Sequence, residues 1–383
     1  GDYHIQLGQG LTFWSGLAMG KSSNVMSLKR SPVGIKPYAS IDENAFLRGA
    51  AFSVKFKKFK LLAFGSKKMI DANIVDDTTR QDGSLVVSSF QASGIHSTIG
   101  TLKDKDAIEE KIVGGEVSYE NKFMTLGVIG AYTKYNGSLD RSLSIYNQFE
   151  FNQNENFVQG FHYSIVKRNI NLYGESSRSL NGGVANLHGL MASLHPRLSL
   201  SVFYRNYGAN YQTTFANSVG EGSRPINEKG LFTGLQFKVN KFWEISSYFD
   251  QFQFPWMKYQ VNQPNSKGMD GFIQVLYHPT KKLNIYARIR HRDKPYNEIE
   301  NIQRNITNVY NVNQWNFRLN INASVTESIR IRNRVEYVSY LRFGGATEKG
   351  ILVLQDITYK PKESKISFTA RLSLIHISEP TRL

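Results

Sequence analysis

The chain has 383 residues, 47 Lys and Arg against 31 Asp and Glu, a formal net charge of +16, and no cysteine. The absence of cysteine excludes a disulfide-bonded scaffold and a thiolate metal site. The sequence contains no run of 18 apolar residues, so it predicts no membrane-spanning helix. Aromatic residues make up 13% of the chain, which argues against disorder and, with 31 Gly, suggests many β-strands.

The chain begins at Gly1 without an initiator Met or a secretory signal, so we expect it to be an internal fragment. Its first strand-like segment is Tyr3–Phe13. Within that segment, Gly8-Gln9-Gly10 begins like a glycine-rich loop but lacks the strand–turn–helix context of a dinucleotide site. Small residues inside a strand or at a bulge explain these glycines better.

Apolar residues then follow period 2 along most of the chain, the spacing that puts alternate side chains on opposite faces of a sheet. Eight short polar turns interrupt this pattern and predict eight hairpins: Lys57-Lys58, Glu120-Asn121-Lys122, Lys167-Arg168-Asn169, His195-Pro196-Arg197, Asn240-Lys241, Pro279-Thr280-Lys281-Lys282, Thr326-Glu327-Ser328 and Lys360-Pro361-Lys362-Glu363-Ser364. Eight hairpins give sixteen strands, and Tyr3–Phe13 adds a seventeenth. Bacterial barrels of one chain have even strand numbers, so this odd count agrees with a sequence that is incomplete at one or both ends.

Longer segments rich in Gly, Asn, Ser and Asp separate the hairpins: Ser15–Leu47, Ser66–Lys111, Asn136–Asn156, Gly208–Glu228 and Asp293–Tyr310. Short turns at one end and long loops at the other are typical of an outer-membrane barrel. A soluble β-sandwich is the main alternative, but its strands average about 5–6 residues, whereas several runs here alternate for ten or more. We therefore predict an all-β fold: a transmembrane antiparallel up-and-down β-barrel of roughly 16–20 strands, in contact with the lipid of the bacterial outer membrane.

Aromatic residues near the predicted strand ends are expected to form the two interfacial girdles of such a barrel. They include Phe13-Trp14, Phe123, Phe242-Trp243, Tyr259, Tyr277, Trp315, Tyr340 and Tyr359.

The late strands predict a basic lumen. On the parity opposite to the apolar residues, they carry the six residues that we predict to bind anions: Arg288, Arg290, Arg318, Arg330, Arg332 and Arg334. A guanidinium group stays charged and grips phosphate or carboxylate in two places. A solvated face whose arginines pair with acidic groups of a plug or of loops is an equally good interpretation.

The sequence offers little evidence of an enzyme. A phosphate loop, a zinc-binding helix and a nucleophile elbow are all absent from the sequence, so we predict no enzyme, no cofactor and no metal. A membrane-embedded hydrolase remains a less favoured alternative, for which His96 near Ser97 and His162 near Ser164 are the only suggestions.

The last residues of the chain have an unexpected sequence. Leu372–Arg382 match the translation of a transposase-type sequencing adapter over eleven residues, so we expect Leu372–Leu383 to be a non-native tail. The native part, residues 1–371, shows no composition break and is predicted to form a single, partial barrel domain.

Diffuse motifs along residues 1–371 resemble the barrel region of helix-hairpin-helix domain-containing outer-membrane proteins of Bacteroidota. The motifs are Gly8-Gln9-Gly10-Leu11-Thr12-Phe13-Trp14, Gly34-Ile35-Lys36-Pro37-Tyr38, Asp42-Glu43-Asn44, Arg48-Gly49-Ala50-Ala51, Asn227-Glu228-Lys229-Gly230 and Phe254-Pro255-Trp256. The resemblance implies a DNA-uptake-like helix-hairpin-helix segment upstream of Gly1, and it carries no DNA-binding role to any residue of this chain.

Two functions are therefore expected. The first is a porin-like barrel that conducts or docks an anionic substrate, a small solute or nucleic acid, the latter through the missing upstream segment. The second is a structural or protein-binding barrel of a surface assembly, plugged by loops such as Ser15–Leu47.

Overall fold

The computed structural model describes residues 1–16, 20–39, 46–75, 85–91, 94–298, 308–342 and 345–378. Within these residues, the only helical elements are α1 (Ile99–Lys103) and the 3₁₀ turn η1 (Ile145–Asn147). Neither is long and apolar enough to cross a membrane. Nearly all other regular structure is antiparallel β-sheet, which confirms the predicted all-β class.

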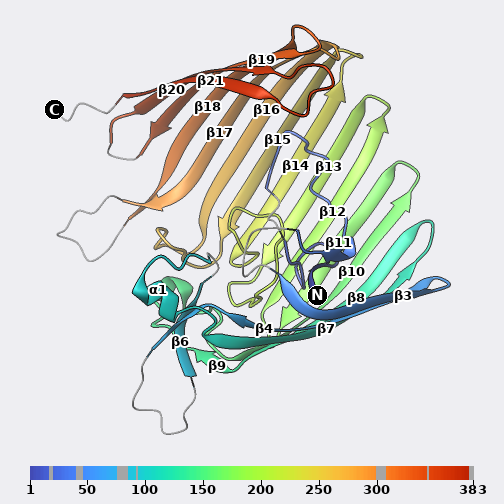
Figure 1. Cartoon of the computed structure of the whole chain (residues 1–383), viewed down its shortest axis with the longest axis vertical. Coiled ribbons are helices and arrows are strands. Elements are labelled where there is room, and N and C mark those ends of the chain that lie inside the picture. Colours follow the sequence, from blue (N-terminus) through green and yellow to red (C-terminus); the bar gives the residue numbers. More distant parts are fainter. Residues whose placement is uncertain are drawn as a thin grey trace.

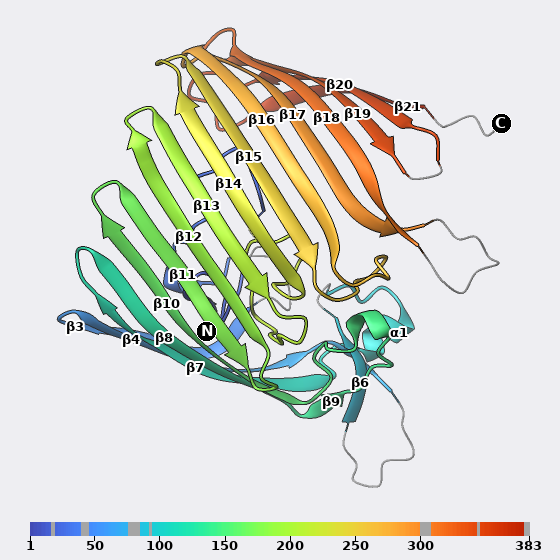
Figure 2. The same cartoon turned by 180° about the vertical axis from the view of Figure 1, so that it is seen from behind.

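Eighteen strands form one sheet, and sixteen of them make a continuous wall (Figures 1 and 2). The wall strands are β3 (Leu47–Phe56), β4 (Phe59–Ile70), β7 (Ile108–Glu120), β8 (Met124–Tyr135), β10 (Glu155–Lys167), β11 (Ile170–Ser179), β12 (Val184–His195), β13 (Leu198–Tyr207), β14 (Glu228–Lys238), β15 (Trp243–Phe254), β16 (Ser266–Thr280), β17 (Leu283–Asn297), β18 (Val309–Ser324), β19 (Ile329–Leu341), β20 (Glu348–Tyr359) and β21 (Phe368–Ser378). Each wall strand pairs antiparallel with the next one along the chain, so the predicted up-and-down topology is confirmed.

All eight predicted short turns join the wall strands that they were expected to join, from β3–β4 to β20–β21. The opposite end of the wall carries the longer connections, with two exceptions. Only residues 180–183 lie between β11 and β12, and only residues 342–347 between β19 and β20. In the described residues no pairing joins β21 to β3, so the curved sheet is an open trough rather than a closed barrel (Figures 1 and 2).

The prediction of a wall strand over Tyr3–Phe13 was wrong. Only β1 (Asp2–Gln6) is extended; it pairs with β2 (Gly34–Pro37) and meets the start of β3 at two residue pairs. The chain then turns inward because Gly8 and Gly10 adopt φ values of +55° and +85°, which break an extended run. Residues 1–16 and 20–38, hereafter the inner segment, lie on the concave side of the wall (Figure 1).

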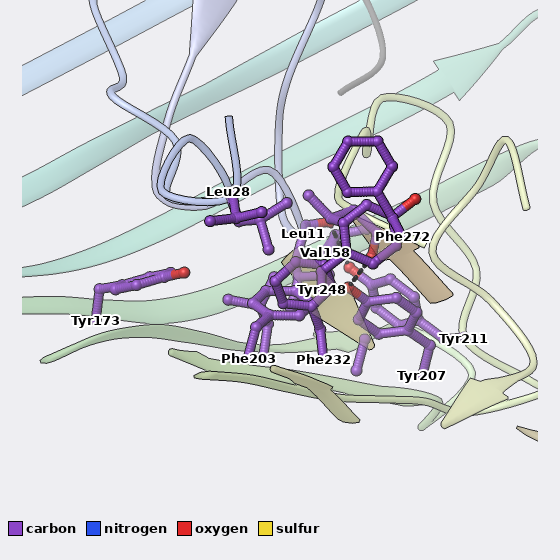
Figure 3. Packing of buried hydrophobic residues seen from close by; sticks show 14 residues of the cluster. Leu11, Leu28, Val158, Tyr173, Phe203, Tyr207, Tyr211, Phe232, Tyr248 and Phe272 are labelled. Atoms are coloured by element: carbon purple, nitrogen blue, oxygen red, sulfur yellow. Dashed lines mark hydrogen bonds between the residues drawn. The ribbon is translucent and has the colours of Figure 1, made fainter. Parts of the chain in front are cut away.

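The inner segment supplies much of the buried core. Leu11, Val25 and Leu28 pack against aromatic residues from β11 to β16. Figure 3 shows Leu11 and Leu28 among these wall side chains. Phe13 and Trp14, predicted as girdle residues, are instead buried in this region, at 1% and 7% exposure.

A smaller sheet of β5 (Ala72–Ile74), β6 (Leu85–Phe90) and β9 (Gly137–Leu139) lies at the loop end of the wall. Its core joins Ala72, Val87 and Leu139 to the ends of the neighbouring wall strands. The long connections there are thus partly ordered by their own packing.

The two faces of the wall differ in chemistry. On the convex face, Ile289, Phe317 and Val335 of three adjacent strands are 44%, 40% and 46% exposed. At the short-turn end, Trp243 packs on Tyr277 with ring centroids 4.4 Å apart, as expected for an interfacial girdle. Antiparallel strands with an outward apolar band are the form in which β-structure crosses the bacterial outer membrane, so the location predicted from the sequence fits this face.

The C-terminal residues continue β21 along β20, from Tyr359↔Phe368 to Lys349↔Ser378. Apolar and polar residues do not alternate in this part of β21 as they do in the other strands. The adjacent Leu374 and Ile375 are both apolar and are 67% and 66% exposed. A non-native origin of Leu372–Leu383 stays a prediction.

Candidate functional site

The six predicted arginines share the concave face of β17, β18 and β19. The register places Arg288 opposite Arg318, and Arg318 opposite Glu336, so these side chains project to the same side. The intervening residues Ile289 and Phe317 face outward. The parity predicted from the sequence is therefore correct for this part of the wall.

This face, hereafter the arginine face, has a large excess of positive charge. At its inward positions β17–β19 carry eight cationic side chains and one carboxylate, Glu336. The cations are Arg288, Arg290, Arg292, Lys294, Arg318, Arg330, Arg332 and Arg334. Several are about one-quarter to one-third exposed, for example Arg332 at 34%, so solute on the concave side can reach them.

Neighbouring strands partly neutralise this charge. Arg318 Nε lies 2.7 Å from a Glu336 oxygen, and Arg332 pairs with Asp356 of β20. Arg288 donates to the amide oxygen of Gln274, at 2.7 and 3.0 Å. The acidic partners thus come from the wall itself rather than from loops, which modifies the second interpretation of these arginines.

Arg330 differs from the other five arginines, since it forms no ion pair or side-chain hydrogen bond within the described residues. It lines a polar hollow of about 570 Å³ near the short turns. The other cations around the hollow are Lys281, Lys282, Arg332 and Arg371, and its one carboxylate is Asp356. Hydroxyl and amide groups, among them Asn322 and Thr358, complete the lining. Such a cavity suits a small solute with more than one negative charge.

Lys21 of the inner segment connects this segment to the wall. Its Nζ lies 2.7 Å from Asp250 of β15 and 3.0 Å from Asp270 of β16, and it also pairs with Glu221. Arg290 grips the same Asp270 through two nitrogens, at 2.6 and 2.9 Å. The inner segment therefore reaches the edge of the arginine face at Lys21.

Each carboxylate around Lys21 also has a second cation. Arg205 of β13 binds Asp250 at 2.8 and 3.0 Å, and Lys294 pairs with Glu221. Burial alone would raise the pKa of Glu221, but the charges of Lys21 and Lys294 lower it to about 2. Burial opposes the charge on Lys21, yet the three carboxylates raise its pKa above the ordinary range. Both groups are charged at neutral pH.

Gly8-Gln9-Gly10 forms a second anchor of the inner segment. The buried carboxylate of Glu175 on β11 accepts hydrogen bonds from the backbone N–H groups of Gln9, Leu11 and Thr12, at 2.5, 3.2 and 2.7 Å. The Thr12 hydroxyl adds a fourth at 2.6 Å. The glycines are therefore neither strand nor bulge residues: they shape a turn whose amides surround a carboxylate.

The two histidines suggested for a hydrolase serve other contacts. His162 Nε2 lies 2.7 Å from Glu116, while Ser164 accepts a hydrogen bond from Lys29 at 2.7 Å. His96 Nδ1 lies 2.9 Å from the backbone oxygen of Thr101. Within the described residues, no hydrogen bond joins His162 to Ser164 or His96 to Ser97, as the histidine–serine pair of a nucleophile requires. In the described residues, no group of three or more acidic or histidine side chains could hold a metal ion.

Comparisons with known proteins give no match to a family model or to a curated protein. Solved structures do match. A BenF-like porin from Pseudomonas fluorescens Pf-5 has 9% identity and a TM-score of 0.38, covering 84% of this chain and 93% of that chain. OpdL from Pseudomonas aeruginosa has 10% identity and a TM-score of 0.37, covering 71% and 87%. The FrpB iron transporter from Neisseria meningitidis has 7% identity and a TM-score of 0.41, covering 85% and 58%.

Proposed function

We propose that this chain forms the wall and the inner plug of an outer-membrane barrel that admits or docks small anionic solutes along the arginine face. The observation that carries the proposal is the excess of eight cations over one carboxylate at the inward positions of three adjacent strands. A surface of one charge raises the local concentration of solutes of the opposite charge. The hollow beside Arg330 is then a binding site for such a solute.

The inner segment favours a gated or docking barrel over a wide, open pore. Its buried side chains and the ion pairs of Lys21 occupy the concave side of β10–β16, whereas the arginine face lies beside it on β17–β19. This arrangement also supports the second candidate, a barrel that binds a protein partner. The sequence predicted for it a plug formed by loops such as Ser15–Leu47, and residues 20–38 of that loop belong to the inner segment.

Nucleic acid as the substrate gains no support from the described residues. Their only α-helix is the five-residue α1, and a helix-hairpin-helix unit requires two helices. The relation to Bacteroidota helix-hairpin-helix proteins stays a proposal that rests on the sequence motifs alone.

Neutralising Arg330, Arg332 and Arg334 to Gln tests the proposed function. We expect the triple variant to lose most of its preference for chloride over potassium in planar bilayers, and to bind a pyrophosphate probe more weakly and with a flatter salt dependence, since salt screens exposed charges. The control variant replaces Lys122, Lys241 and Lys360 at the short turns by Gln, which removes the same charge elsewhere. Equal behaviour of the two variants would contradict the proposal.

A further inference from the structure

A second cavity lies at the loop end of the wall, where the connection 255–265 contacts the end of β17. It has a volume of about 250 Å³ and is formed by three connections: residues 140–154, 208–227 and 255–265. Four aromatic side chains line it, from Tyr146, Phe149, Trp256 and Tyr259. We name it the rim pocket. None of its residues takes part in the ion pairs of the arginine face.

Hydrogen bonds fix the walls of the rim pocket. The Asn227 side chain donates to the backbone oxygens of Trp256 and Met257, at 3.1 and 2.9 Å, and accepts from the Trp256 N–H at 2.7 Å. Asn227 itself has a φ of +53°, a conformation that Asn tolerates better than most residues. The indole N–H of Trp256 donates to the oxygen of Ile145 at 2.9 Å. Two motifs that the sequence singled out, around Asn227 and Trp256, thus meet here.

The aromatic rings are arranged as separate faces rather than as a closed core. Phe149 and Trp256 meet edge to face, with centroids 5.4 Å apart and an interplanar angle of 69°. Tyr146 and Tyr259 are tilted by 57° at 6.0 Å. Tyr259 is 68% exposed and Phe149 37%, which leaves apolar ring surface open to a ligand.

Donors and acceptors flank these rings. Glu150 pairs with Arg224 at 2.9 Å and with Arg141 at 3.3 Å, and the side chains of Glu150 and Arg224 are 18% and 46% exposed. The amide oxygen of Asn147 is buried and has no hydrogen-bond partner among the residues that the structure describes. The Lys258 ammonium lies 4.4 Å from the centre of the Phe254 ring, and burial lowers its pKa. The pocket therefore presents a carboxylate, a free amide acceptor, a guanidinium group and an ammonium group.

From this combination we propose that the rim pocket binds a saccharide ring. Aromatic side chains combine a large apolar surface with low flexibility, and the C–H face of a sugar ring can lie on them. Sugar hydroxyl groups both donate and accept, so they satisfy Asn147 and Glu150 as well as Arg224. The volume of about 250 Å³ limits the bound part to one or two sugar units.

A flat aromatic carboxylate is the main competing ligand class. It would match the rings and the cations, but it has no hydrogen-bond donor for the amide oxygen of Asn147 or for the Glu150 carboxylate. Polar groups left unpaired in a pocket reject a ligand strongly. The hydrogen-bond acceptors of Asn147 and Glu150 therefore favour a saccharide over an aromatic carboxylate.

Ligand binding can be measured on the whole chain in lauryldimethylamine oxide, a detergent without a sugar group. The probes are cellobiose, lactose, maltose and galacturonic acid, with benzoate representing the competing class, and saturation-transfer NMR reports which protons touch the protein. The variants are Tyr259→Ala and Glu150→Gln. Phe123→Ala, an exposed aromatic at a short turn, is the matched control, and circular dichroism confirms that all variants fold.

We expect at least one sugar to receive saturation at its ring protons. Tyr259→Ala should weaken that sugar about three- to tenfold through the lost ring contact, and Glu150→Gln about tenfold through the lost charged acceptor. Phe123→Ala should bind like the original chain. The proposal is overturned if no sugar receives saturation, if both pocket variants bind like the control, or if benzoate binds more tightly than every sugar.

Discussion

Replacing Lys21 by Met should release the inner segment from the wall. The change removes a cation that is enclosed by Glu221, Asp250 and Asp270, and Met keeps the apolar length of the side chain. Breaking a buried ion pair by removing one partner costs about 3–5 kcal/mol. Here each carboxylate keeps a second cation, so we expect the lower end, about 3 kcal/mol.

This loss can be read from hydrogen exchange of the backbone amides of the inner segment. A local destabilisation of about 3 kcal/mol corresponds to about 150-fold faster exchange where opening is at equilibrium. The amides of Leu11 and Thr12 report on the segment, and those of β14 report on the wall, whose exchange should stay unchanged. Lys36→Met is the control, since Lys36 belongs to the same segment but is exposed. If both variants exchange alike, Lys21 does not hold the segment and the reasoning fails.

Three further outcomes are expected. Glu175→Gln should cost about 3 kcal/mol, because about two hydrogen bonds to a charged group are lost. Faster exchange of the Gln9 and Thr12 amides checks this, and Glu120→Gln, which removes a half-buried carboxylate at a short turn, should change nothing there. At acid pH the inner segment should detach from the wall. The pKa of Glu221 is about 2 in the folded chain and 4.5 ordinarily. The stability that its charge gives to the attachment is therefore complete above about pH 4.5 and is lost as the pH falls towards 2. A spin label on Ser22→Cys should become mobile in that range; unchanged mobility down to pH 2 would count against the ion cluster. In neutral salt, Arg330→Gln alone should weaken pyrophosphate binding without affecting that label.

The sequence predicted the wall well because its signals are local. Each short turn is a polar break of a few residues in an alternating pattern, such as Lys57-Lys58 or Asn240-Lys241, and all eight were found. The concave position of the arginines follows from the same alternation. Neither inference needed to know which strands pair in which register.

The inner segment could not be predicted in this way. Tyr3–Phe13 has the composition of a strand, and its path is decided by the positive φ of two glycines and by Glu175, 166 residues away from Gln9. Likewise, the acidic partners of the arginines are cross-strand neighbours. Asp356 is paired with Arg332 only through the register of β19 with β20, which single-strand patterns do not contain.

The rim pocket was also out of reach of local patterns. Asn227 and Trp256 each belong to a motif that the sequence singled out, but nothing in their spacing predicts that the Asn227 side chain hydrogen-bonds to the backbone of Trp256. Their contact depends on the turn of the chain through β14 and β15, which brings the two loops together.

Thiol modification at single positions of β18 tests the basic, water-filled concave face most directly, because the chain has no cysteine of its own. Asn322→Cys lies inward, opposite Arg332 in the register, and Phe317→Cys lies outward. In membranes and at low salt, an anionic thiosulfonate reagent should modify the inward thiol faster than a cationic one, relative to their rates with a free thiol in solution. The outward thiol should react with neither. A faster cationic reagent at the inward position, or equal labelling of both positions, would contradict the account.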